Sequence, residues 1–584
     1  MWNQYSQCQK IQSGPGVIRF HNINGKNVVR WTVSVHKDGI YARKHNLVIL
    51  SMALNASVPL MDHLLNDPAQ VFNTRYFLYV LVNIPILAVV FNILRQMLPQ
   101  DRSKPPVVFH WFPFIGSSIQ YGSDPLAFLF ACQEKYGDVF TFILLGRRVT
   151  VALGAKGNNF VLGGKSTVFN AEDAYKHMTS PVFGNDVVYA IPNPQFMEQK
   201  KFIKVGLSTE SFRTYVGMFE DEVETYLNNE PVFKSYQNPK NAGEWGSFDP
   251  CQALAEITIL TASRTLQGKQ IRAALDKSFA DLIADLDGGF TPMNFFFPNL
   301  PLEHYRRRDR AHKKISDFYV DIVKQRKAKG DDQELDMITA LSGQVYRSGK
   351  PMTDSEVAHC MIALLMAGQH TSASTGAWAV LRLADNPDFA EKLFQEQVKF
   401  FGTPDGELRP MTYDEARELP LMNALIRETL RLHPPIHAIM RHVREDVPVP
   451  PSLAAPSKDG VYVVPKGDYV LASPTVSHTD PRVWRNAMKF DPYRWIDPEG
   501  MAAQALETYV DEHGEKIEYG FGAPGRHRCV GEQFAYLQVG TILATLVREL
   551  EFRLPKPFPA NNYYTMIPTP QAPRNVEYRR RRRN

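Results

Sequence analysis

Residues 520–550 read GFGAPGRHRCVGEQFAYLQVGTILATLVREL, and this stretch decides the fold. Cys529 lies in a loop rich in glycine and arginine, just before the helical period that begins at Glu532. A helix N-terminus and neighbouring cations favour a thiolate over a thiol. The sulfur could be a nucleophile, a zinc ligand or an axial iron ligand. Zinc would need further ligands at suitable spacing, and a nucleophile would need a base that the sequence does not show beside it.

Residues 353–387 predict a long helix that crosses the interior of a domain. Thr353 and Glu356 form a capping box at its start, and Asn386-Pro387 stops it. The 31 residues between these signals, 354–384, are apolar on most faces, as in a helix that is buried all round.

Near the middle of that helix lies a polar patch made of Gly368, Gln369, His370, Thr371 and Ser372. A glycine in a helix interior costs about 1 kcal/mol relative to alanine. A threonine hydroxyl can bond a carbonyl of the preceding turn and bend the helix. A functional kink and a locally satisfied helix contact are equally good interpretations of the patch alone.

A shorter predicted helix, residues 421–432, carries Glu428 and Arg431 three positions apart on one face. A surface pair of this kind contributes little to stability. A buried pair would need a third partner, for which Arg494 is the candidate. These three residues are therefore predicted to be structural.

The composition excludes several classes of protein. The 584 residues are 22% charged and 44% hydrophobic, unlike disordered, collagen-like or coiled-coil chains. Five thinly spread cysteines exclude a disulfide scaffold. The net charge of +5 equals the five arginines at 579–583, so we expect no nucleic-acid partner. We expect the basic tail, 579–584, to be a solvated, frayed end, with contact to acidic lipid headgroups as the alternative.

Residues 76–94, YFLYVLVNIPILAVVFNIL, predict a transmembrane anchor helix. A helix of this length spans about 28 Å, close to the thickness of a bilayer core. Arg95, Arg102 and Lys104 follow, which places the C-terminal side in the cytosol. A buried core helix is the alternative. We interpret residues 1–75 as a poorly ordered extension, with a later start methionine favoured, and 95–106 as a basic, proline-rich linker.

Taken in order, the motifs resemble those of the cytochrome P-450 haem-thiolate monooxygenases. The ordered set is A-G-x-x-T (Ala367, Gly368, Thr371), E-x-x-R (Glu428, Arg431), Pro492 with Arg494, and G-x-H-x-C-x-G (Gly525, His527, Cys529, Gly531). The resemblance implies a mainly α fold with small β-sheets and an N-terminal transmembrane helix. It assigns residues 107–578 to the haem-thiolate monooxygenase domain.

Longer stretches resemble the sterol 14α-demethylases, and the fungal branch fits best. They are YKHMTSPVFG at 175–184, MEQKKF at 197–202, GFTPMNF at 289–295, PNLP at 298–301 and PIH at 435–437. His370 before Thr371, and His527 before the cysteine, stand where most other relatives of the superfamily have an acid and an arginine.

The resemblance implies a role for each matching residue. Cys529 is the implied axial thiolate, and His370 and Thr371 are the implied pair for oxygen activation and proton delivery. The implied haem-propionate partners are Tyr175, Tyr189, Lys200, Arg441 and His527, which suit two carboxylates. The implied lining of the sterol cavity is Met178, Phe183, Phe290, Phe295, His437 and Met566, a wall that suits a rigid polycyclic hydrocarbon.

The implied reaction removes the 14α-methyl group of lanosterol- or eburicol-type sterols by three successive oxidations, in ergosterol-type sterol biosynthesis. The implied cofactor is haem b, with the cysteine thiolate on the iron. No flavin or nicotinamide motif is visible, so electrons are expected from NADPH through a separate membrane-bound reductase. Membrane lipids and azole inhibitors are further implied partners. The implied location is the endoplasmic reticulum membrane, single-pass, with the catalytic domain on the cytosolic side.

The approach to the cysteine departs from the family pattern. The family reads S-P-Y-L-P-F-G-A before G-R-H-R-C, whereas residues 518–525 read EYGFGAPG. We interpret this as a segment missing between Gly522 and Ala523. Two alternatives to the demethylase therefore stay open: a haem monooxygenase of another lipid substrate, and a catalytically impaired paralogue that only binds haem or sterol.

Overall fold

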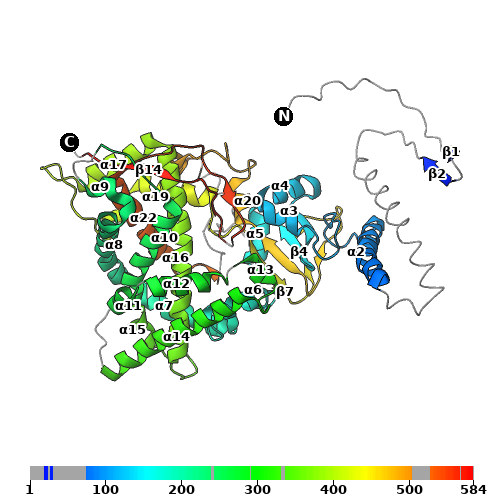
Figure 1. Cartoon of the computed structure of the whole chain (residues 1–584), viewed down its shortest axis with the longest axis horizontal. Helices are drawn as coiled ribbons and strands as arrows, with labels where there is room; N and C mark the ends of the chain where they lie inside the picture. The colour runs from blue at the N-terminus through cyan, green and yellow to red at the C-terminus, as the bar shows by residue number, and fades with distance from the viewer. Residues whose placement is uncertain are drawn as a thin grey trace, which may run out of the picture. The chain divides into compact units, whose positions relative to one another are not determined.

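The computed structural model describes residues 19–23, 26–30, 74–238, 243–275, 277–289, 291–329, 336–500, 502, 527–565 and 567–582 (Figure 1). The chain divides into two compact units. The first comprises residues 1–99 with Trp111–Pro113, and the second comprises the remaining residues from Gln100 onward.

The first unit contains a hairpin and one long helix. Strands β1 (Arg19–Ile23) and β2 (Lys26–Arg30) pair antiparallel, within the segment predicted to be poorly ordered. The expectation that residues 1–75 form a poorly ordered extension stays a prediction.

Helix α2 (Thr74–Met97) contains the predicted anchor, 76–94, and extends into the predicted linker. Asn83, Pro85 and Asn92 interrupt its apolar sequence. Within the part of the chain that the structure describes, no helix has both the length and the apolar character that crossing a membrane requires. The transmembrane part of the predicted fold is therefore not confirmed.

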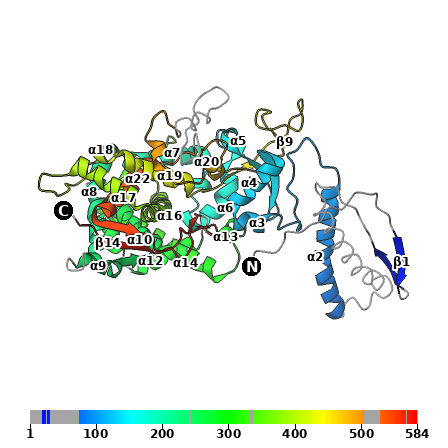
Figure 2. The same cartoon turned by 90° about the horizontal axis from the view of Figure 1, so that it is seen from above.

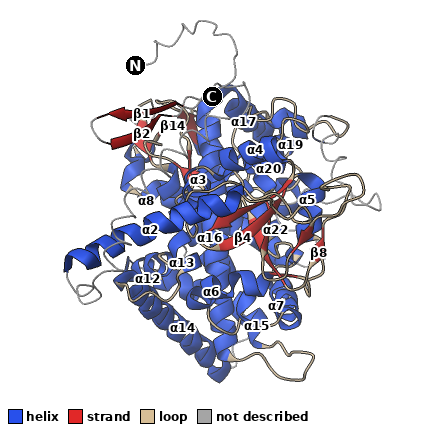
Figure 3. Ribbon diagram, turned by 90° about the vertical axis from the view of Figure 1, so that its right-hand side faces the viewer, coloured by secondary structure: helices blue, strands red, loops and turns tan. Residues whose placement is uncertain are grey.

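The second unit is mainly helical, with helices in blue and strands in red in Figure 3. Its helices are α3 (Ser118–Ser123), α4 (Pro125–Tyr136), α5 (Gly154–Leu162), α6 (Ala171–Phe183), α7 (Asn193–Gly206), α8 (Thr209–Asn229), α9 (Lys234–Gln237), α10 (Pro250–Ala262), α11 (Lys269–Ala274), α12 (Lys277–Asp287), α13 (Pro292–Phe296), α14 (Glu303–Lys329), α15 (Met337–Ser342), α16 (Asp354–Asp385), α17 (Pro387–Phe401), α18 (Tyr413–Ala416), α19 (Pro420–Leu432), α20 (Pro474–Thr479) and α22 (Glu532–Glu549). Shorter helical turns are η2 (Val188–Ala190), η3 (Pro231–Phe233), η5 (Ser263–Gln267) and η6 (Pro492–Trp495).

The strands of the second unit form small sheets. They are β3 (Val139–Leu144), β4 (Arg147–Ala152), β5 (Phe169–Asn170), β6 (Gly246–Phe248), β7 (Ile439–Val443), β8 (Val447–Pro448), β9 (Val463–Val464), β10 (Tyr469–Ala472), β11 (Leu550–Arg553), β12 (Asn561–Asn562), β13 (Thr569–Pro570) and β14 (Val576–Arg580). One sheet has five strands in the order β3-β4-β10-β7-β5, and another has three in the order β11-β14-β6. Two-stranded pairs, β12-β13 and β8-β9, complete the set.

Helix α16 is the central element of this unit. Thr353 and Glu356 form both halves of the predicted capping box, and the helix ends at Asp385, one residue beyond the prediction. It packs against α10, α14, α19 and α22. Figures 1 and 2 both place α8, α9 and α17 at one end of the unit and α3, α4 and α5 at the other, with α16 between them.

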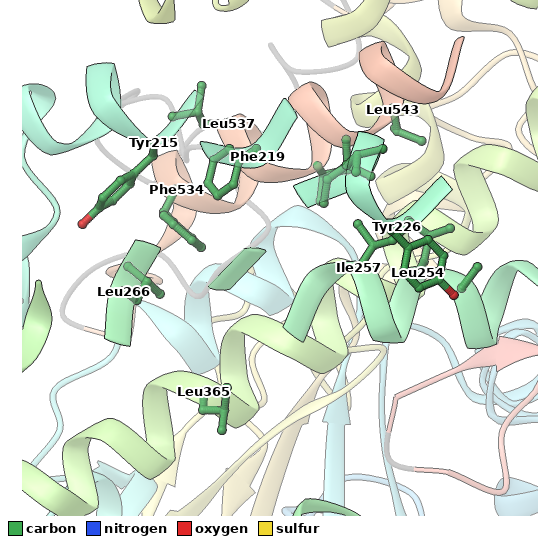
Figure 4. Close-up of a cluster of buried hydrophobic side chains, with 14 of the residues drawn as sticks. Tyr215, Phe219, Tyr226, Leu254, Ile257, Leu266, Leu365, Phe534, Leu537 and Leu543 are labelled. Atoms are coloured by element: carbon green, nitrogen blue, oxygen red, sulfur yellow. The ribbon is translucent and has the colours of Figure 1, made fainter. Parts of the chain in front are cut away.

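The main hydrophobic core surrounds this helix. Figure 4 shows aromatic and aliphatic side chains from α8, α10, α16 and α22 in one buried cluster. Phe219 and Phe534 are in edge-to-face contact there, with ring centroids 5.8 Å apart. This packing holds α22, and therefore the loop that carries Cys529, against the helical core.

The predicted contact among Glu428, Arg431 and Arg494 is present, and Glu428 and Arg431 are completely buried. Arg431 Nε and Nη2 donate to the two Glu428 oxygens at 2.9 and 2.8 Å, and Arg494 Nε donates to Glu428 Oε1 at 3.1 Å. Trp495 Nε1 donates to Glu428 Oε2 at 2.9 Å, a contact that the sequence did not reveal. Arg431 Nη1 uses the backbone carbonyls of His478 and Ala487. The cluster ties α19 to the segment that leads to η6.

Two predicted boundaries need correction. Ser103 and Pro106, in the predicted linker, accept backbone hydrogen bonds from Val463 and Thr141, so the second unit begins before residue 107. The predicted frayed tail is wrong for Arg579–Arg581, because β14 continues through Arg580. Arg579 pairs with Glu551, and Arg581 Nη1 lies 2.6 Å from Glu391 Oε2. Carboxylates on neighbouring elements thus pair with charges that were expected to be solvated.

Candidate active site

Cys529 lies two residues before Gly531, the N-cap of α22. It is the exposed one among the described cysteines, while Cys132 and Cys360 are buried and Cys251 is half-buried. Cys529 faces an open cavity of about 2010 Å³, which Tyr189 and Lys200 also line. The structure therefore brings three of the predicted haem-site residues to one cavity.

The electrostatic surroundings of Cys529 differ from the sequence prediction. Although Cys529 is exposed at the cavity, the atoms packed around its thiol partly desolvate it, and this raises its pKa above the ordinary value. The neighbouring Glu532 raises the pKa further, whereas the Gly531 backbone, Lys200 and Arg528 lower it. The prediction that the helix N-terminus and the neighbouring cations favour the thiolate gives the sign of those contributions but not of the whole shift. Desolvation and Glu532, which pairs with Arg528 at 2.8 Å, outweigh them. In the apoprotein the thiol form is favoured, and binding a metal cation at the sulfur would be needed to remove the proton.

The predicted propionate partners lie close together. The Tyr175 and Tyr189 rings stack with centroids 5.4 Å apart, and the positive charge of Arg441 opposes the rise in the pKa of both phenols that burial causes. The Asn193 amide contacts His527 Nε2 at 3.1 Å, and the His527 ring lies 6.1 Å from that of Tyr189. Arg441, Tyr175, Tyr189 and His527 therefore form one polar and aromatic group.

Lys200 reaches the cysteine loop from α7. Its Nζ donates to the Arg528 carbonyl at 2.5 Å. Burial lowers the pKa of this ammonium, and Cys529 opposes that shift. Lys200 thus fixes the loop backbone one residue before the cysteine, in addition to its predicted role toward a propionate.

One side of the polar patch on α16 faces open space, whereas Gln369 and Ser372 are buried. Ala367 is exposed although most of the helix is buried, and a Cβ added at Gly368 would meet no atom within 4 Å. Thr371 Oγ1 donates to the Ala367 carbonyl at 2.7 Å, the local bond that was expected. An open space beside the middle of a buried helix favours the functional interpretation of the patch.

His370 has a partner that the sequence did not reveal. Its Nε2 lies 2.7 Å from Asp287 Oδ1, at the end of α12, and each side chain is 31% exposed. The two residues are 83 positions apart, so no local pattern could pair them. The pair connects the middle of α16 with the partly exposed carboxylate of Asp287 on α12.

The predicted sterol-cavity residues fall into two groups. Met178 and Phe295 belong to one buried cluster, whereas Phe183 packs against the main helical core. His437 contacts the rings of Tyr121 and Tyr563, and burial lowers its pKa to about 4. None of these four lines the cavity at Cys529. Phe290, Met566 and the shortened segment 518–525, which were also predicted to belong to the site, lie outside the described residues.

This arrangement fits a haem better than a zinc ion. Among the described residues, no group of three or more His, Cys, Asp or Glu side chains could hold a metal ion. A haem needs one strong axial ligand from the protein, and Cys529 faces open space. The cations and phenols near it suit two propionates. The open patch on α16, at Ala367 and Gly368, leaves room beside a flat ligand.

The cytochrome P450 family matches residues 105–577. The chain belongs to the cytochrome P450 family. Members of this family bind haem through a cysteine thiolate, and Cys529 is the cysteine of this chain that stands in the matching motif. A retinoic acid-bound cyanobacterial P450 has a related structure with a TM-score of 0.67, at 20% identity over 82% of this chain and 100% of that chain. The mainly α fold with small sheets is thereby confirmed.

Closer relatives place the chain within the sterol 14α-demethylase group of the P450 family. The lanosterol 14-alpha demethylase of Mycosarcoma maydis is 50% identical over 84% of this chain and 91% of that protein. A sterol 14-alpha demethylase of Aspergillus flavus is 44% identical over 84% of this chain and 94% of its own length. The eburicol 14-alpha-demethylase of Penicillium italicum is 43% identical over 84% of this chain and 95% of its own length. The chain is therefore an enzyme of the fungal type that its sequence resembles.

Proposed function

We propose that this P450 removes the 14α-methyl group of lanosterol- or eburicol-type sterols by three successive oxidations, in ergosterol-type sterol biosynthesis. The observation that carries the proposal is the open patch at Ala367 and Gly368 on α16, with Thr371 and the His370–Asp287 pair beside it. The high identity to sterol 14α-demethylases along most of the chain supports the same substrate class.

Cys529 would hold the haem iron, and the bound haem supplies the oxidising chemistry. Arg441, Tyr175, Tyr189, Lys200 and His527 would hold the propionates at the edge of the site. Charge-assisted bonds of this kind orient a planar ligand as well as binding it. The protein's own work is then to place one methyl group, keep water away and supply protons.

The proton-delivery role falls to His370 and Thr371. Asp287 Oδ1 lies 2.7 Å from His370 Nε2, at the edge of the ring, so this contact fixes the orientation of the imidazole. A histidine held in a fixed orientation can pass a proton within the site. Thr371 Oγ1 is held by the Ala367 carbonyl on the exposed side of the helix.

The sterol would lie against the buried cluster that contains Met178 and Phe295, with Phe183 and His437 completing the wall and Phe290 and Met566 as further proposed members. Neutral His437 suits an apolar ligand, because burial keeps it uncharged at physiological pH. Azole inhibitors would occupy the same cavity. Cations at the open cavity beside Cys529 include Lys200, Lys201 and Arg427, and they favour an acidic electron donor. We propose that this donor is an NADPH-dependent reductase.

A reconstitution assay tests the proposed function. The purified full-length protein is incubated with an NADPH-dependent P450 reductase, NADPH and either lanosterol or eburicol. The expected products are the 14-demethylated sterol with a new double bond and formate in equal amounts. A protein that binds haem with its thiolate intact but forms neither product from either sterol would contradict the proposal.

We expect Asp287→Asn to lower kcat for demethylation by at least about tenfold, since proton transfers by positioned side chains contribute this much or more. The asparagine keeps the shape but replaces the carboxylate beside His370 by a neutral amide. The solvent deuterium isotope effect on kcat should rise, while the haem content stays unchanged.

Asp285→Asn is the matched control. Asp285 lies two residues before Asp287 on the same helix, and its side chain pairs with Arg307. Its kcat should stay near that of the wild type. Equal kcat values for Asp287→Asn and the wild type would show that this carboxylate takes no part in proton delivery.

We further propose that α2 anchors the enzyme to the endoplasmic reticulum membrane, with the catalytic domain on the cytosolic side. Leu81, Ile84 and Phe91 on this helix are each more than half exposed, which suits contact with lipid. A chain that begins at Lys104 should leave the membrane fraction on carbonate washing, whereas the full-length chain should stay. Equal retention of both would place the main membrane contact elsewhere.

A further inference from the structure

Arg147 is surrounded by aromatic rings at the first position of β4. Its guanidinium carbon lies 5.1 Å from the centroid of Phe295, 5.0 Å from that of Phe296 and 5.1 Å from that of Tyr469. The first two rings belong to α13 and the third to β10. One cation thus joins the short helix α13 to two adjacent strands of the five-stranded sheet.

His177, on α6, completes the group. Arg147 Nη2 lies 3.5 Å from His177 Nε2, and the His177 ring is in edge contact with that of Phe295 at 5.0 Å. Burial and the charge of Arg147 lower the pKa of His177, and a hydrogen bond to the Phe295 backbone opposes this shift. A neutral ring therefore accepts from Arg147 on one side and holds the Phe295 backbone on the other.

Arg147 is half-buried, and its hydrogen bonds do not account for the desolvation of its guanidinium. Its Nη1 is buried and has no hydrogen-bond partner among the described residues, and burial lowers its pKa. The faces of the three aromatic rings offset most of the cost of desolvating this positive charge. A guanidinium stacks on aromatic rings better than an ammonium does. The position thus requires the planar cation itself.

Phe295 connects this group to the proposed active site. It is 4% exposed, shares a buried cluster with Met178 and meets the Tyr175 ring at 6.1 Å. Tyr175 in turn stacks on Tyr189. A shift of Phe295 would therefore move both the wall proposed for the sterol and the aromatic edge proposed for the haem.

We propose that Arg147 is a positioning residue that fixes Phe295 through its ring contacts and thereby sets the affinity and selectivity for sterols. This role rests on the proposed function, because it concerns the wall of the sterol site. Arg147 does not touch the reacting methyl group, so the rate of chemistry on a bound sterol should be nearly independent of it.

The test uses the full-length haem protein with Arg147→Met, which keeps an apolar stem, and Arg147→Lys, which keeps the charge. Spectral titrations give the Kd for lanosterol and eburicol, and turnover gives KM and kcat. We expect Arg147→Met to raise Kd and KM by about tenfold, with kcat within about twofold and an altered ratio between the two sterols. Arg147→Lys should recover part of the affinity. Imidazole, a small ligand that binds the iron directly, should have the same Kd in all variants and in the wild type.

Arg148→Met is the matched control. Arg148 is the next residue on β4, and its Nε is 3.1 Å from Asp468 Oδ2 on the other side of the strand. Sterol Kd should change little in this variant. The double variant Arg147→Met, Phe296→Leu should lose less free energy of sterol binding than the sum of the losses in the two single variants. Both substitutions break the same contact, so their effects overlap.

Two outcomes separate the role of Arg147 from the proposed function. No sterol-induced spectral shift in the wild type would overturn the proposed function and this role with it. A normal shift in the wild type, together with sterol Kd values in both Arg147 variants that equal the wild-type value, would overturn the positioning role alone. If Arg147→Met does not fold, Arg147→Lys decides, and an unchanged sterol Kd in that variant would contradict the requirement for a planar cation.

Discussion

The Cys529→Ser variant is expected to lose all sterol oxidation and the spectrum of a thiolate-bound haem. An alcohol oxygen is a weaker donor to iron than a thiolate, and thiolate donation is what favours cleavage of the O–O bond in this family. The expected loss is complete within detection, measured as 14-demethylated sterol and formate from a reconstituted reductase system.

Cys251→Ser is the control for this experiment. Cys251 is half-buried in α10 and lies away from the cavity at Cys529, and burial raises the pKa of its thiol to about 12. Its variant should keep both the spectrum and the activity. Demethylation by Cys529→Ser at the wild-type rate would show that another residue holds the iron.

Arg431→Ala is expected to prevent accumulation of folded, haem-containing protein. It would remove two of the donors and one of the two cations that contact the fully buried Glu428, leaving Arg494 as the remaining cation. Breaking a buried pair costs about 3–5 kcal/mol. That loss is a large part of the stability of a typical domain, about 5–15 kcal/mol. The measurements are the yield of soluble haem protein and the midpoint of thermal unfolding. Glu428→Gln, which keeps the shape, should show a smaller loss of the same kind.

Lys313→Ala gives the surface comparison. Lys313 pairs with Asp317 on α14 at 2.7 Å, but both side chains are more than 60% exposed. Its removal should change the free energy of unfolding by less than about 0.5 kcal/mol. A normal yield and unfolding midpoint for Arg431→Ala would contradict a structural role for the buried cluster.

The sequence could predict those features whose signals are local or strictly ordered. The capping box and the Asn386-Pro387 stop located α16 to within one residue. The order of the motifs identified the family, because several weak patterns in one sequence rarely agree by chance. Even the contact of Glu428 with Arg431 and Arg494 could be anticipated, since a buried pair requires a further partner.

Contacts between distant segments could not be read from the sequence. Asp287 meets His370 across 83 positions, and nothing in the stretch around Asp287 marks it as the partner of this histidine. Arg147 and Phe296 are joined only because β4 and α13 meet in the fold. The C-terminal arginines looked like a solvated run, since the strand pairing of β14 with β11 depends on a partner elsewhere in the chain.

The thiol of Cys529 shows why the sign of an electrostatic effect needs a structure. Sequence reasoning counted the cations near the sulfur and predicted a lowered pKa. The structure adds burial and Glu532, which together outweigh Lys200, Arg528 and the Gly531 backbone. The thiolate therefore depends on the haem iron, and the pKa of the free protein gives no measure of the bound state.

The central claim is that Cys529 holds a haem iron as a thiolate in this chain. The difference spectrum of the reduced wild-type protein with carbon monoxide tests it most directly, since the position of the band depends on the ligand opposite the carbon monoxide. We predict the band of a thiolate-bound haem in the full-length protein, at one haem per chain. A band of the histidine-bound type, or no haem in a folded protein, would contradict the claim.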